Sequence, residues 1–81
     1  MASLAEIIEQ AVADYGFRLA VMWGTDDLIA RSGLDEGEGR ALADIVVPEL
    51  KLLPNPVEPE DRQGVSERIH RLVSEALADR D

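Results

Sequence analysis

Short helices separated by cap residues are the strongest constraint that this sequence of 81 residues places on its fold. Four residues whose side chains can accept hydrogen bonds from the first amides of a helix divide the first half of the chain: Ser3, Asp14, Thr25 and Asp35. Apolar residues follow these caps at the i, i+3, i+4 spacing of one helix face. We therefore predict helices over residues 4–13, 15–23, 26–32 and 36–44, with Gly33 as a left-handed helix end.

The segment 45–59, IVVPELKLLPNPVEP, has a different character because it holds all four prolines of the chain. None of them suits a helix interior, and a lone strand would have no pairing partner in a small helical domain. We predict an extended, proline-rich strap, with five partly buried residues: Val46, Val47, Leu50, Leu52 and Leu53. A longer amphipathic helix is then predicted from about residue 59 to 78, in a C-terminal region 60–81.

The predicted fold class is all-α: a small bundle of four short helices plus a longer C-terminal helix, joined by the strap. A chain of this length makes one domain, 1–81, which buries only about 60% of its unfolded surface. Because the sequence has no cysteine, neither a disulfide nor a thiolate metal site can stabilise it.

The net charge of −9, from 17 acidic and 8 basic residues, restricts the classes of partner. A polyanionic phosphate backbone and an anionic membrane would both be repelled, so we expect neither nucleic acid nor membrane as a partner. No apolar run is long enough for a membrane span, and a cytoplasmic protein is the expectation. The acidic surface either maintains solubility or steers the domain toward a basic partner.

Residues suited to catalysis are few. His70 is the only histidine, and too few potential ligands surround it in the sequence for a zinc site. No serine stands in a nucleophile-elbow motif that would activate it, and no phosphate-binding glycine pattern is complete. We therefore predict a protein without catalytic residues, metal or cofactor.

The stretch 14–23, DYGFRLAVMW, ends in the only tryptophan of the chain. Asp14 is expected to cap the helix, and Phe17 and Val21 are expected to face inward. Arg18, Met22 and Trp23 flank these residues on the helical wheel and are the predicted partner-binding residues. The alternative is that Met22 and Trp23 belong to the core. We expect Arg18 to lie at an exposed edge, so Arg18→Ala should weaken partner binding by more than tenfold and leave the thermal midpoint nearly unchanged.

Nine residues between 11 and 42 fit a spaced pattern of known proteins: Ala11, Asp14, Phe17, Arg18, Val21, Ile29, Leu34, Glu38 and Leu42. The pattern resembles the small helical domain of borosin-type leader regions in ribosomally made, modified peptide precursors. It is also similar to the small alpha subunit of protocatechuate 4,5-dioxygenase-type enzymes. Gly24 and Thr25 stand where these families have Asp-Pro or Asn-Pro, and Asp35 replaces a threonine cap.

The resemblance implies a non-catalytic recognition domain that binds a larger protein, in the first case its modifying enzyme. In the second case the chain would be an accessory subunit beside the large subunit of a ring-opening dioxygenase. A third class is a helical protein that associates with itself as a homo-oligomer.

Overall fold

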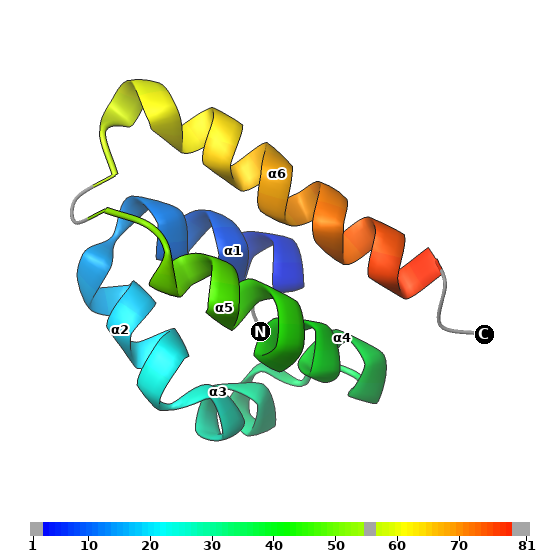
Figure 1. The fold of residues 1–81 in the computed structure, drawn as a ribbon. Helices are drawn as coiled ribbons and strands as arrows, with labels where there is room; N and C mark the ends of the chain where they lie inside the picture. The colour runs from blue at the N-terminus through cyan, green and yellow to red at the C-terminus, as the bar shows by residue number, and fades with distance from the viewer. Residues whose placement is uncertain (1–2, 55–56, 79–81) are drawn as a thin grey trace.

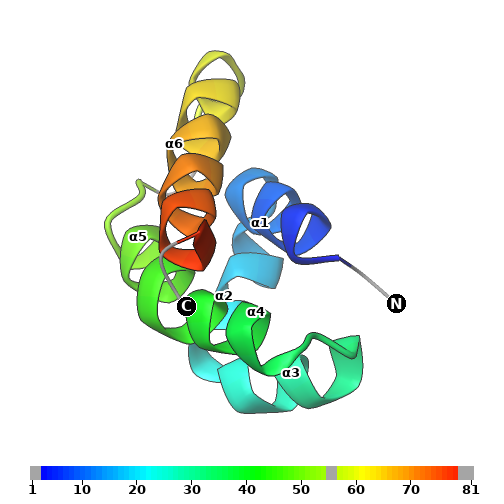
Figure 2. The same ribbon diagram turned by 90° about the vertical axis from the view of Figure 1, so that its right-hand side faces the viewer.

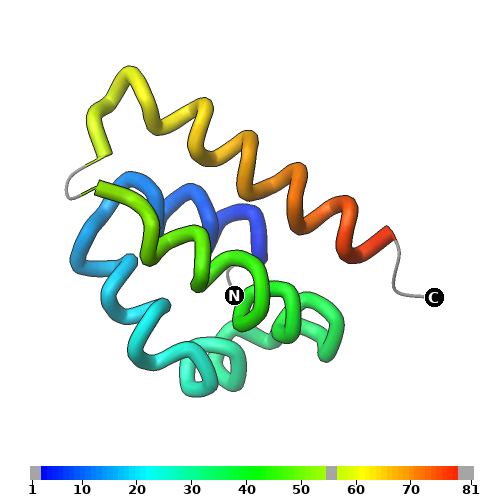
Figure 3. The backbone as a smooth tube through the Cα atoms, viewed as in Figure 1, coloured from blue at the N-terminus to red at the C-terminus, as the bar shows by residue number. Residues whose placement is uncertain are grey.

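The chain folds as helices arranged around the first one in the computed structural model, which describes residues 3–54 and 57–78 (Figure 1). The helices are α1 (Leu4–Ala13), α2 (Tyr15–Trp23), α3 (Thr25–Ser32), α4 (Glu36–Ala41), α5 (Val47–Lys51) and α6 (Pro59–Ala78). A π-helical segment, η1 (Leu42–Val46), joins α4 to α5, so residues 36–51 form one continuous helical path (Figure 3). All regular structure in the described ranges is helical, which confirms the predicted all-α class.

The core forms where α1 packs against α2 on one side and α6 on the other (Figure 2). The α1 residues at helical spacing are all buried, as their sequence pattern predicts: Leu4, Ile7, Ile8, Ala11 and Val12. They meet buried side chains from later elements: Val21, Leu42, Val46, Val47, Leu50, Val57, Ile69 and Val73.

Local hydrogen bonds fix the helix starts, mostly as predicted. Ser3 Oγ accepts from the Glu6 amide at 3.2 Å, and Asp14 Oδ1 accepts from the Phe17 amide at 3.3 Å. Asp35 and Glu38 form a complete capping box, and Gly33 ends α3 with a left-handed φ of 72°.

The predicted cap at Thr25 is wrong. Gly24 is the residue ahead of α3, and Thr25 is its first helical residue. The Thr25 hydroxyl instead donates to the Val21 and Met22 carbonyls at the end of α2. A hydroxyl can both donate and accept, and here the unpaired carbonyls of the preceding helix end lie within its reach.

The extended strap predicted over residues 45–59 is also wrong for residues 45–51, which are helical. The prediction treated every proline as a helix breaker, but Pro48 lies in the first turn of α5, where it is tolerated. Just ahead of it the Val47 amide donates to the Leu42 carbonyl, so the helix has already widened to the i→i−5 register. Residues 52–54 and 57–58 are non-helical, and the strap positions 55 and 56 lie outside the described residues.

The five residues that were expected to be partly buried in the strap differ in their exposure. Val46, Val47 and Leu50 are buried, and Leu53 is half-buried, but Leu52 is 75% exposed. Leu52 is the first residue after α5.

The long helix α6 starts at Pro59, one of the predicted starts, and buries Ile69 and Val73 against the other helices. Residues 79–81 of the predicted C-terminal region lie outside the described residues. Among the helices that the structure describes, none combines the length and apolar character needed to cross a membrane.

Candidate functional site

Arg18 is buried in the interior, with 1% of its surface exposed, so its predicted place at an exposed edge is wrong. Its guanidinium fork donates three hydrogen bonds of 2.9 Å: from Nε to the Ala11 carbonyl, from Nη2 to the Val12 carbonyl, and from Nη1 to the Pro54 carbonyl. The Arg18 guanidinium also lies 5.5 Å from the centre of the Tyr15 ring. Arg18 therefore joins the end of α1, the start of α2 and the segment after α5.

The physical reason for this burial is that the last carbonyls of α1 have no amide partner within their own helix. A cation at the negative end of a helix dipole is favourable, and a planar fork can serve several carbonyls at once. Burial lowers the pKa of Arg18, and the neighbouring Tyr15 opposes this effect; an arginine still stays charged at neutral pH. Arg18 has a structural role here.

A signal for this burial was present in the sequence. Arg18 precedes the buried Val21 by three residues, so the two side chains lie on the same face of α2. The carbonyl of Pro54 could not be foreseen, because it lies 36 residues away along the chain.

Trp23, at the opposite end of α2, is 79% exposed. The core alternative for this residue is therefore wrong. Met22 is half-buried and packs against the core, as the packing alternative predicted. Of the three residues predicted for partner binding, only Trp23 presents most of its side chain to solvent.

Trp23 borders a groove of about 610 Å³ between α2 and α3. Its lining is mostly apolar or small and comes from both helices: Phe17, Ala20, Trp23, Gly24, Asp27, Leu28 and Arg31. Asp27 and Arg31 form an exposed i, i+4 ion pair on α3, and the hydrogen bonds that Arg31 donates to the Asp27 carboxylate raise the pKa of Arg31. Arg31, which the sequence analysis did not select, is thus the arginine beside Trp23. Its i, i+4 spacing from Asp27 was the signal that could have found it.

A second hollow, of about 440 Å³, lies on the other side of α3, against α4 and η1. It has an apolar contribution from Ile29 and Leu34, and its rim carries four carboxylates: Asp26, Asp35, Glu36 and Asp44. Arg40 is the one basic residue in its lining, and it is paired with Glu36 at 3.2 Å. We call this region the acidic cleft.

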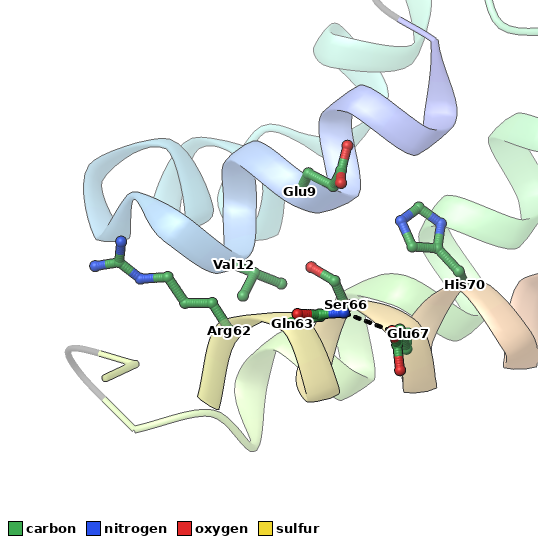
Figure 4. Close-up of a pocket in the computed structure, with 7 residues that line it drawn as sticks. All are labelled: Glu9, Val12, Arg62, Gln63, Ser66, Glu67 and His70. Atoms are coloured by element: carbon green, nitrogen blue, oxygen red, sulfur yellow. Dashed lines mark hydrogen bonds between the residues drawn. The ribbon is translucent and has the colours of Figure 1, made fainter. Parts of the chain in front are cut away.

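His70 lies in a third hollow, of about 450 Å³, between α1 and α6. Figure 4 shows Glu9 and Val12 on α1 opposite Arg62, Ser66 and His70 on α6. The hydrogen bond drawn there joins Gln63 to Glu67 at 3.1 Å. Across the described part of the chain, no hydrogen bond joins His70 to Ser66 or to a carboxylate, and no group of three or more acidic or histidine side chains is placed to hold a metal ion.

This third hollow therefore has no nucleophile–base pair in hydrogen-bonding contact and no metal-binding cluster among the residues described. The groove beside Trp23 offers different chemistry: an exposed indole, a phenylalanine, a leucine and a charged rim. Exposed tryptophan is a residue type enriched at protein-binding hot spots. We take the Trp23 groove as the candidate functional site.

The comparisons with known proteins add no relative to this description. Neither the protein-family models, nor the curated proteins, nor the solved structures contain a match to the chain.

Proposed function

We propose that this chain is a non-catalytic recognition domain that binds a larger protein through the Trp23 groove. The observation that carries the proposal is the exposure of Trp23, 79%, beside a mostly apolar groove. Tryptophan is the residue type most enriched where partners dock, because burying its large apolar surface on binding contributes strongly to affinity.

The resemblance suggests two settings for such a domain. In the first, the domain belongs to a modified-peptide precursor and binds its modifying enzyme; in the second, it is an accessory subunit of an extradiol ring-opening dioxygenase. Both need a surface that binds a larger protein, and the Trp23 groove supports that shared requirement. A methyltransferase or cyclase encoded beside this chain would favour the first setting, and a dioxygenase large subunit the second.

The experiment is a calorimetric titration of the purified chain with the enzyme that is encoded beside it. We expect Trp23→Ala to weaken binding by more than tenfold, about 1.4 kcal/mol. Leu52→Ala is the matched control, because Leu52 is equally exposed, at 75%, but lines a different hollow between α5 and α6.

Equal affinity of the wild-type chain and Trp23→Ala would overturn the proposal for this groove. Light scattering of the free chain tests the third class, self-association. If the wild-type chain has the mass of a dimer and Trp23→Ala has the mass of a monomer, the partner at this groove is a second copy of the chain and not a larger protein.

A further inference from the structure

The two hollows lie on opposite sides of α3, and each takes part of its lining from that helix. Asp27, Leu28 and Arg31 face the Trp23 groove, whereas Asp26 and Ile29 face the acidic cleft. Successive residues of an α-helix are rotated by about 100°, so α3 naturally presents one set to each side. An occupant of the Trp23 groove that extends across α3 would next meet the acidic cleft.

The charges on this surface are predominantly negative. The linings of the two hollows together contain five carboxylates and two arginines, and each arginine is already paired with one of those carboxylates. Asp26 and Asp44 are exposed on the acidic-cleft side, and the half-buried Ile29 and Leu34 line the same hollow. A lining that combines apolar side chains with an excess of carboxylates complements a ligand that has an apolar anchor and neighbouring positive charges.

From this complementarity we infer that the partner segment is a cationic amphipathic helix, with its apolar anchor in the Trp23 groove and its Lys or Arg side chains over the acidic cleft. This inference rests on the proposed function, since it names the chemistry of the partner at the same groove. A helix is the fitting form because the described part of the chain has no sheet edge to which an extended segment could add.

The size of α3 sets the spacing expected in such a partner. An α-helix with its side chains is about 10 Å across, and a helix rises 1.5 Å per residue. A partner helix lying across α3 would therefore carry its basic residues roughly seven positions, or two turns, from the apolar anchor.

A second copy of this chain fits the surface less well. It would bring nine more net negative charges to a surface that is already negative. Like charges brought together at an interface are unfavourable, so the partner should have the opposite sign.

The test uses three synthetic helical peptides with the same apolar face, whose residues seven positions from the anchor are Lys, Gln or Glu. Trp23 is the only tryptophan, so with peptides that lack tryptophan the fluorescence reports on this groove directly. We expect the Lys peptide to shift the emission to shorter wavelength and to bind at least tenfold more tightly than the Gln peptide. The difference should be largely lost at about 1 M salt, where the Debye length is about 3 Å.

A pair of charge variants locates the preference. Asp26→Asn combined with Asp44→Asn should bring the affinity for the Lys peptide close to that for the Gln peptide. Glu60→Gln combined with Asp61→Asn is the matched control, because it removes two exposed charges at the start of α6, far from α3 (Figure 1), and should keep the preference.

Three results would overturn the inference. If all three peptides bind equally, the inference that the partner is cationic is rejected. The groove would still bind a helix, so the proposed function would stand. No shift with any peptide rejects the cationic helix as occupant, while the titration of Trp23→Ala with the larger protein decides the proposed function separately. Loss of the preference in the α6 control variant would show that it comes from net charge and not from the acidic cleft.

Discussion

Arg18 and Trp23 belong to the same short helix, five residues apart, yet they lie in opposite environments. Arg18, a charged residue, is 1% exposed and holds three carbonyls together; Trp23, a large apolar residue, is 79% exposed. A polarity scale predicts the reverse arrangement. The difference teaches that in a domain this small, the hydrogen-bonding needs of helix ends can outweigh the polarity of a side chain.

The largest expected effect is at the buried end of α2. Arg18→Ala would leave the Ala11, Val12 and Pro54 carbonyls without their donor, and we expect a loss of about 3 kcal/mol or more in the free energy of unfolding. For a domain of this size that corresponds to a fall in thermal midpoint of roughly 12 °C or more. This reverses the sequence-based expectation that the midpoint would be nearly unchanged. Thermal denaturation followed by circular dichroism measures it.

Two variants give that measurement its controls. Arg18→Lys keeps the charge but has no planar fork, so it should recover only part of the lost stability. Arg31→Ala removes an exposed arginine and should leave the midpoint close to that of the wild type. If Arg18→Ala has the same thermal midpoint as the wild type, the three hydrogen bonds from Arg18 do not stabilise the fold, and the contrast between Arg18 and Trp23 does not hold.

An intermediate effect is expected at Asp14, which precedes α2 and caps it. Asp14→Ala removes the acceptor of the Phe17 amide and should cost about 1 kcal/mol of stability, whereas Asp14→Asn should cost little. Urea denaturation of the two variants gives the comparison. Equal losses in both would mean that charge matters here rather than the hydrogen bond of the cap.

The smallest effect on stability is expected at the exposed end. Trp23→Ala should change the free energy of unfolding by no more than about 0.5 kcal/mol, because an exposed side chain loses little packing. In the wild type, a soluble quencher such as acrylamide should reach the Trp23 indole nearly as readily as free tryptophan in solution. Strong protection of the indole in the free chain would show that Trp23 is covered, and the contrast with Arg18 would disappear.

The first two helices could be predicted well because their signals are local, whereas the helix predicted over residues 36–44 ends as an α-helix at Ala41 and continues as η1. The bounds of α1 and α2 agree with the periodicity and with caps at Ser3 and Asp14, which act within three residues. The prediction of an extended strap failed at residues 45–51, because proline content alone does not show at which position of a helical turn Pro48 lies. The position of Pro48 depends on the widened i→i−5 hydrogen bonding of η1, and the sequence has no signal for this that is as clear as a cap residue or an apolar periodicity.

The candidate site was predicted only in part. Trp23 was selected for its residue type, and its exposure agrees with a binding role that stays a prediction. Arg18 was selected for the same edge and is buried, while Asp27 and Arg31 form the actual charged rim beside Trp23. A helical wheel gives the direction of a side chain but not which element lies opposite it.

The sequence by itself determined that this chain is helical, where α1 and α2 begin and end, and which apolar residues of α1 face the core. These properties follow from hydrogen bonds and side-chain spacing within a few residues. Only the tertiary structure decided that Arg18 is buried and that Trp23 is not. The Arg18 guanidinium needs acceptors from α1 and from Pro54, which meet only when distant segments pack together. Trp23 stays exposed because no other segment in the described part of the chain packs over its side chain.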